Sequence, residues 1–154
     1  MSRAFVRESD QPEPVPERLV SAHPNFVTSA GLELIEARVH ELEAARASHE
    51  SGLPDPEESA RIARDLRYWT QRRATARVIE PSPEPQVVRF GVEVTLRFDD
   101  GREQTFRLVG EDEADPAHGR VSWVSPLATA LIGRRPGDEV GALGARATIV
   151  RLAS

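Results

Sequence analysis

Alternation of apolar and polar residues from Val92 to Phe98 places the tightest constraint on the fold of this chain. Every second side chain in this stretch is apolar, which is the period of a β-strand with one buried face. Asp99-Asp100-Gly101 follows at once, and an Asp-Gly pair is typical of a tight hairpin turn. The sequence therefore predicts a return strand over residues 104–109, ended by Gly110 where a side chain would be unwelcome.

The remaining C-terminal residues supply one short helix and more strand. Ser125 followed by Pro126 is typical of an N-cap and a first helical position, and Gly133 is typical of a helix stop. These signals predict a helix that reaches Ile132. Strands are expected over residues 120–124 and 148–152. Several strands with a single short helix indicate an α+β domain over residues 87–154.

Helical periodicity replaces alternation between residues 25 and 79. Apolar side chains recur there at three- and four-residue spacing in two stretches, separated by a Ser-Gly-Leu-Pro break at 51–54. Thr28 or Ser29 can cap the first helix. The two stripes are Leu32, Ile35, Val39 and Leu42, and then Ile62, Leu66, Trp69, Arg73 and Ala76. They predict an antiparallel helical hairpin, packed as a coiled coil.

The second helix carries a start signal of its own. Asp55 can act as its N-cap, Pro56 suits the first helical position, and Glu58 stands where a capping box requires an acid. These residue types are fully explained as a helix start.

Proline-rich segments flank the helical region on both sides. Residues 1–24 hold four prolines among charged residues and few apolar groups, which predicts a flexible leader. Residues 80–86 hold three more prolines and predict a stiff linker. The predicted order is leader 1–24, helical hairpin 25–79, linker 80–86 and sheet domain 87–154.

Composition and charge limit the classes of function. The chain has no cysteine, so it offers neither a disulfide framework nor a thiolate site, and its four histidines lack the spacing of zinc ligands. No stretch is apolar enough for a membrane span or a signal peptide, so we expect a cytoplasmic protein without membrane contact. A net charge of -5 argues against non-specific binding to duplex DNA. A protein partner is favoured.

Two motifs in the C-terminal half carry a family resemblance. Residues 107–115 read R-L-V-G-E-D-E-A-D, and residues 125–133 read S-P-L-A-T-A-L-I-G, with P-G-D shortly after. They resemble the C-terminal domain of the bacterial transcript-cleavage factors GreA and GreB. R-Y-W-T at 67–70 is similar to a GreB segment near the base of its hairpin. The chain is identified as a GreB-like member of the GreA/GreB family with a shortened coiled coil, a Rnk-like relative being an alternative, and the resemblance implies an FKBP-like sheet domain.

The resemblance implies an accessory factor of RNA polymerase, not an enzyme with a cofactor of its own. Family members insert the hairpin into the polymerase secondary channel and seat the sheet domain on the rim helices. The implied polymerase contacts are Glu111, Asp112, Glu113, Ser125, Pro126 and Leu127. A solvated acidic loop and a simple helix cap are the structural alternatives at these positions. We expect a monomer that regulates transcription elongation.

Charge is unequal between the two predicted helices. Residues 29–50 carry an excess of glutamate, whereas residues 56–79 are rich in arginine. One interpretation is ion pairing across the hairpin. The other is contact of Arg61 and Arg64 with nascent RNA or with an acidic wall of the channel.

The tip of the hairpin separates two versions of this function. Family members hold a Mg²⁺ ion in the polymerase active site with tip carboxylates, and Asp55 and Glu58 resemble that arrangement. A cleavage-competent factor is therefore one interpretation. Aligned on residues 67–70, however, each arm is shorter than in Gre proteins by about two turns, or roughly 10 Å of reach. Shorter arms favour a polymerase binder that holds no metal.

A third interpretation belongs to a different class of protein, an FKBP-like peptide-binding module or prolyl isomerase. That activity requires a pocket lined by aromatic side chains. The aromatic residues of the sheet domain are Phe90, Phe98, Phe106 and Trp123. The three phenylalanines have a simple explanation as core residues.

Overall fold

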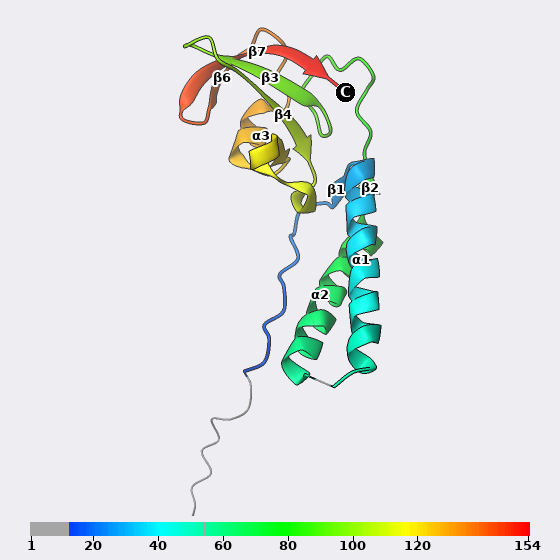
Figure 1. Ribbon diagram of the computed structural model, residues 1–154. Helices are drawn as coiled ribbons and strands as arrows, with labels where there is room; N and C mark the ends of the chain where they lie inside the picture. The colour runs from blue at the N-terminus through cyan, green and yellow to red at the C-terminus, as the bar shows by residue number, and fades with distance from the viewer. Residues whose placement is uncertain (1–12, 54) are drawn as a thin grey trace, which may run out of the picture.

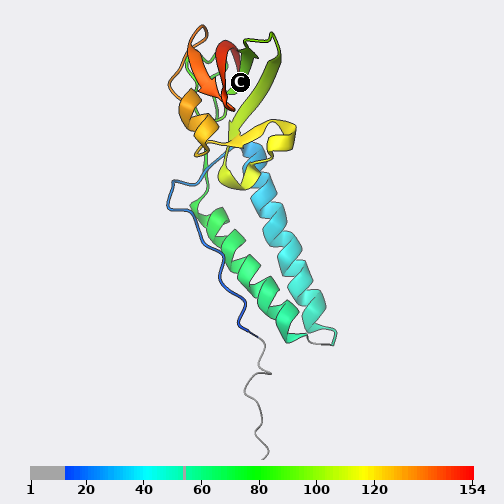
Figure 2. The same ribbon diagram turned by 90° about the vertical axis from the view of Figure 1, so that its left-hand side faces the viewer.

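The computed structural model describes residues 13–53 and 55–154, which form a helix pair joined at one end to a sheet domain (Figure 1). Helix α1 spans Ser29–Glu50 and helix α2 spans Pro56–Thr75. The two helices lie side by side and run in opposite directions in both views (Figure 1 and Figure 2). The predicted mixture of helix and sheet is confirmed.

Local sequence explains where both helices begin. Thr28 is the N-cap of α1, because its side-chain oxygen accepts a 3.0 Å hydrogen bond from the Gly31 N–H. Asp55 is the N-cap of α2, and its carboxylate accepts a 3.0 Å hydrogen bond from the Glu57 N–H. Pro56 occupies the first helical position, where no N–H is needed.

A short apolar seam joins the two helices. Its buried members are Ile35, Val39, Ile62 and Leu66. These residues are the centres of the two predicted stripes. The prediction is wrong at the C-terminal end of α2, where Arg72 is buried and Arg73 is exposed. The chemical reason is a carboxylate from the sheet domain that lies beside Arg72.

A two-stranded parallel sheet ties the open ends of the helix pair together. Strand β1, Phe26–Val27, precedes α1, and strand β2, Arg77–Val78, follows α2. The Arg77 N–H donates to the Asn25 carbonyl at 2.9 Å. The sequence does not predict these strands, because two residues are too few to show an alternating pattern.

The larger sheet has five strands in the order β5-β4-β3-β7-β6. They are β3 (Glu93–Phe98), β4 (Glu103–Val109), β5 (Arg120–Ser122), β6 (Glu139–Ala142) and β7 (Ala145–Ala153). Neighbouring strands are antiparallel except β4 and β5, which are parallel. The predicted hairpin of β3 and β4 is confirmed, and Gly101 in its turn has a φ of 85°.

The hairpin of β6 and β7 was only partly predicted. The expected last strand is present, but it begins earlier than residue 148 and pairs with β6, whose bounds the sequence does not predict. Leu143 and Gly144 connect the two strands with φ values of 52° and 75°. A two-residue turn of this kind suits the twist of a β-hairpin.

Helix α3 (Pro126–Leu131) covers one face of the larger sheet (Figure 1). Ser125 caps it as predicted, since its hydroxyl oxygen accepts a 3.2 Å hydrogen bond from the Ala128 N–H. Two short 3-10 helices, η2 (Glu111–Glu113) and η3 (Pro116–His118), connect β4 to β5. The core between sheet and helix contains Val88, Val92, Val94, Leu96, Phe98, Phe106, Leu108, Val121, Ala128, Leu131, Val140, Ala142, Ala147 and Ile149.

The described part of the predicted leader, residues 13–24, has no helix or strand and runs along the helix pair (Figure 2). Glu17 and Arg18 contact α2. The predicted flexibility of residues 1–12 and the break at Pro54 lie outside the described residues. Within the described residues, no helix combines the length and apolar character that crossing a membrane requires.

Candidate functional site

The tip of the helix pair presents the two carboxylates predicted as metal ligands. Asp55 and Glu58 are both exposed. The predicted capping box is only half formed, because Glu58 makes no hydrogen bond to the Asp55 N–H among the described contacts. The Asp55 N–H lies instead 3.1 Å from Nε2 of His49, and the Asp55 carbonyl lies 3.0 Å from the same nitrogen. His49 therefore fastens the end of α1 to the start of α2.

Carboxylate oxygens at the tip have the chemistry that Mg²⁺ prefers. In the described part of the chain, however, no group of three or more His, Cys, Asp or Glu side chains could hold a metal ion. Asp55 and Glu58 alone supply too few ligands for a site within this chain, so further ligands would have to come from a partner.

The arginines of α2 do not pair with the glutamates of α1 in the described structure. Arg61 contacts Glu57 of its own helix at 2.5 Å, and Arg64 contacts Asp65 at 2.9 Å. Ion pairing across the hairpin is therefore wrong as an account of this basic surface. The Arg61 side chain remains 54% exposed, which leaves its charge accessible at the surface.

The acidic turn η2 joins the sheet domain to the helix pair. The Glu113 carboxylate accepts a 3.0 Å hydrogen bond from the Thr28 N–H and a 2.9 Å bond from the Gly110 N–H. The Thr28 hydroxyl donates a further hydrogen bond to the same carboxylate. Glu113 is only 8% exposed, so this carboxylate depends on these donors in place of water. One carboxylate thus fixes the start of α1 to the end of β4.

Two glycines make room for that carboxylate. A Cβ at Gly31 would lie 2.2 Å from Cδ of Glu113, and a Cβ at Gly110 would lie 2.5 Å from the Phe26 carbonyl oxygen. Both distances are shorter than van der Waals contact. The prediction that Gly110 stands where a side chain is unwelcome is confirmed.

A buried ion pair forms the second half of the joint. Nε of Arg72 lies 2.6 Å from Oδ2 of Asp112, and the two side chains are 2% and 7% exposed. The Tyr68 hydroxyl donates a 2.5 Å hydrogen bond to the other oxygen of Asp112. Glu111 lies farther away, with an oxygen 3.8 Å from Arg72. We use the word joint for Thr28, Gly31, Tyr68, Arg72, Gly110, Asp112 and Glu113.

The pKa of Tyr68 is raised to about 12, and burial is the largest cause. The hydrogen bond to Asp112 and the negative charge of Asp112 contribute to the same rise, because both disfavour a phenolate at this position. Arg72 and Arg18 act in the opposite direction. Tyr68 is therefore a neutral hydrogen-bond donor at physiological pH.

The predicted polymerase contacts fall into two groups with different exposure. Asp112 and Glu113 have their carboxylates in the joint, and Glu111 is half-buried beside it. Pro126 at the start of α3 is exposed, and Leu127 is half-buried against the core. The start of α3 is thus the more accessible of the two predicted surfaces.

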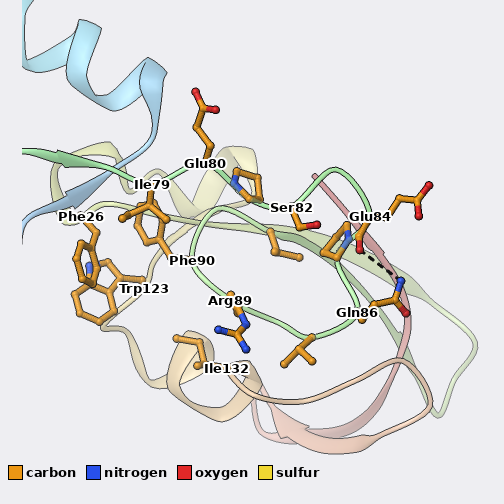
Figure 3. A pocket seen from close by; sticks show the side chains of 14 residues that line it. Phe26, Ile79, Glu80, Ser82, Glu84, Gln86, Arg89, Phe90, Trp123 and Ile132 are labelled. Atoms are coloured by element: carbon orange, nitrogen blue, oxygen red, sulfur yellow. Dashed lines mark hydrogen bonds between the residues drawn. The ribbon is translucent and has the colours of Figure 1, made fainter.

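An apolar cavity of about 610 Å³ lies between the linker and the sheet domain (Figure 3). Phe26, Phe90 and Trp123 line one end, and the ring centroids of Phe26 and Trp123 are 5.0 Å apart. Linker residues that include Pro81 and Pro85 form another wall. The predicted linker is therefore part of an aromatic-lined cavity, which the aromatic residues of the sheet domain alone do not predict.

Sequence reasoning missed Arg72, Tyr68 and Thr28 as partners of the acidic turn. The sequence signal is weak, because nothing local distinguishes a buried arginine from the exposed arginines of the same helix. Each partner lies at least 40 residues from its carboxylate along the chain. Only the tertiary fold brings them together.

The chain is similar in sequence to known proteins. The family model described as "Transcription elongation factor, GreA/GreB, C-term" matches residues 82–148. Transcription elongation factor GreB of Yersinia pestis is 30% identical over 137 residues, which cover 77% of this chain and 80% of that protein. The chain therefore belongs to the GreA/GreB family, as its motifs predict.

Similarity is higher over a shorter stretch. Transcription elongation factor GreB of Neisseria meningitidis serogroup B is 48% identical over 81 residues. The matched stretch covers 51% of this chain and 50% of the length of that protein. Among solved structures, the GreA/GreB factor of Nitrosomonas europaea is 23% identical, with coverage of 84% of this chain and 98% of that chain and a TM-score of 0.41.

Proposed function

We propose that the protein binds bacterial RNA polymerase at its secondary channel and regulates transcription elongation. The observation that carries this proposal is the joint, in which buried carboxylates of a GreA/GreB-type sheet domain fix it to one end of a helix pair. A fixed joint allows one part to hold the polymerase while the other projects into it. A flexible connection would not set the direction of the helices.

The sheet domain is the proposed anchor, with an FKBP-like fold seated on the rim helices of the channel. Pro126 supports this role because it is exposed at the start of α3, where the half-buried Ser125 and Leu127 flank it. Glu111 can add charge at the edge of the same surface. Asp112 and Glu113 contribute indirectly, since their carboxylates position the anchor on the helix pair.

The helix pair is the proposed channel element, packed as a short coiled coil. With 22 residues in α1 and 20 in α2, the helices are about 33 and 30 Å long at 1.5 Å per residue. We propose that Asp55 serves as a cap and that neither tip carboxylate reaches the catalytic metal. The alternative remains that Asp55 and Glu58 hold Mg²⁺ together with polymerase carboxylates, where the ion would activate water.

An RNA cleavage assay on backtracked polymerase complexes tests this proposal. We expect no stimulation of cleavage by this protein, and slower cleavage by a full-length Gre factor when this protein is in excess. Cleavage stimulation that disappears in Glu58→Gln would overturn the non-cleaving version. Neither stimulation nor competition, together with no binding to polymerase, would overturn the proposed function itself.

A binding measurement with surface variants locates the anchor. Pro126→Arg should weaken polymerase binding by about tenfold or more, because it places a charge at the proposed contact. Gln104→Arg on β4 is the control, since Gln104 is also exposed and lies outside this surface. Equal binding by both variants would show that the start of α3 is not the contact.

A second candidate function, peptide binding or prolyl isomerisation, is favoured by the cavity beside Phe26, Phe90 and Trp123. Apolar pockets with aromatic walls suit proline-containing segments. An isomerase assay with a proline tetrapeptide distinguishes the two functions. Acceleration that is lost in Trp123→Ala would support a prolyl isomerase, whereas no acceleration would exclude isomerisation.

A further inference from the structure

Residues 17–24, which we call the strap, lie along α2 instead of extending away from it (Figure 2). The Glu17 carboxylate accepts hydrogen bonds from the Arg67 guanidinium, one of them from Nε at 3.3 Å. The Arg18 guanidinium lies 4.0 Å from the centre of the Tyr68 ring. It also lies 3.6 Å from Asp65. Glu17 and Arg18 of the strap therefore each face a residue of opposite charge on α2.

Side-chain contacts alone attach the strap to α2 in the described structure. The hydrogen bonds between the two segments join Glu17 to Arg67, and no backbone group of the strap takes part. Leu19 is 94% exposed, so the strap buries little apolar surface there. Exposed ion pairs are weak and are screened by salt. An attachment of this kind can open and close while the rest of the fold stays intact.

The C-terminal end of the strap is firmly held. Immediately after it, Nδ2 of Asn25 donates a 2.7 Å hydrogen bond to the Arg72 carbonyl and a 3.1 Å bond to the Thr75 hydroxyl. The Asn25 carbonyl also accepts from the Arg77 N–H of β2. Within the strap, the His23 ring also packs edge-on against the Trp123 ring, with centroids 5.9 Å apart, so opening of the strap hinges before His23. Because the segment is tethered, its effective concentration at α2 stays high, and weak contacts suffice to close it.

We propose that the strap is a detachable intramolecular cover of the surface that Arg67 and Tyr68 form on α2. When closed, it pairs Arg67 with Glu17 and covers the face of the Tyr68 ring with Arg18. When open, it leaves the Arg67 guanidinium available to an acidic ligand and uncovers the Tyr68 ring. The strap thus competes with acidic ligands for α2, and this inference does not depend on polymerase binding.

Backbone motion of the full-length protein tests the closed state. In ¹⁵N heteronuclear NOE measurements at low salt, Leu19 and Val20 should give values close to those of α2. Arg67→Gln should lower the values of both residues, because it removes the partner of Glu17. Arg61→Gln is the matched control, since Arg61 has the same charge on the same helix and pairs with Glu57. Strap values that are low in the wild type, or equal in both variants, would overturn the proposal.

Competition is tested with hexaglutamate as the acidic probe. Glu17→Gln, which removes the carboxylate that pairs with Arg67, should bind the probe up to about fivefold more tightly than the wild type, the factor that corresponds to one exposed ion pair. Amide shifts at Arg67 and Tyr68 should report this binding. Equal affinity in the two proteins would overturn the cover. Strap signals that depend on protein concentration would also overturn it, because they would show exchange between two copies.

Discussion

Arg72 and Arg67 lie on the same helix, and each pairs with a carboxylate from a different part of the chain, yet the two pairs differ in burial. Arg72 is 2% exposed and meets Asp112, whereas Arg67 is 59% exposed and meets Glu17. In the buried pair, loss of one partner leaves a charge without water. In the exposed pair, water replaces the lost partner. The same chemistry therefore builds a permanent joint at one site and a reversible contact at the other.

The largest expected effect comes from breaking the buried pair. Arg72→Gln should lower the free energy of unfolding by about 3 to 5 kcal/mol, because Asp112 would remain buried without its cation. Urea unfolding followed by circular dichroism measures this change. Arg73→Gln is the control, since Arg73 is exposed on the same turn, and it should change stability by less than about 0.5 kcal/mol. Similar losses of unfolding free energy in both variants would contradict the assignment of Arg72, and not Arg73, to the buried joint.

A smaller effect is expected at the other half of the joint. In most helices Gly→Ala stabilises by roughly 1 kcal/mol. Gly31→Ala should instead destabilise by about 1 to 3 kcal/mol, because its Cβ would lie 2.2 Å from Cδ of Glu113 and would displace that carboxylate from its donors.

Thermal unfolding of Gly31→Ala checks the sign of this effect. Gly52→Ala is its control, because a Cβ at Gly52 would meet its nearest neighbour at 3.7 Å, an ordinary contact distance. A higher midpoint for Gly31→Ala than for the wild type would contradict the close packing at the joint.

The third prediction uses the single tyrosine of the chain, Tyr68. Absorbance at 295 nm should show that it titrates near pH 12 in the folded protein, against roughly 10 in urea. Because the folded pKa is raised, the contribution of Tyr68 to stability is complete below pH 10 or so and is lost as pH rises through the folded pKa. Asp112→Asn should lower the folded pKa. An unchanged value in that variant would exclude Asp112 as a cause.

The comparison of the two arginines also shows what sequence can and cannot predict. Features that depend on a few neighbouring residues are predicted correctly, such as the helix caps at Thr28 and Ser125 and the turn at Gly101. Arg72 and Arg73 could not be distinguished, because the carboxylate that selects Arg72 lies 40 residues away. The bounds of strand β6 are not predicted because glycine and alanine, which have low strand propensity, occupy half of its positions.

The same limit applies to the candidate site. The acidic turn is predicted as a contact because its position matches the family motif, but the exposure of its three acids is not predictable from that motif. Asp112 and Glu113 have buried carboxylates because partners from Tyr68, Arg72 and Thr28 converge on them. At the tip, the cap at Asp55 was predicted from local sequence. The contact with His49 was not, because it depends on how the two helices meet.

The smallest expected effect concerns the exposed pair of Arg67 and Glu17. In this pair, attachment of the strap to α2 can be measured separately from the stability of the fold. The hydrogen bond from Arg67 lowers the pKa of Glu17, and the positive charges of Arg67 and Arg64 act in the same direction. The contact is therefore complete above the ordinary pKa of a glutamate and is lost as pH falls through the lowered value. The carboxyl ¹³C shift of Glu17 should titrate at lower pH in the wild type than in Arg67→Gln, which lacks the guanidinium donor. In Glu17→Gln, Leu19 should become mobile while the midpoint of urea unfolding stays unchanged. A lower midpoint would show that the strap contributes to the fold, as the joint does.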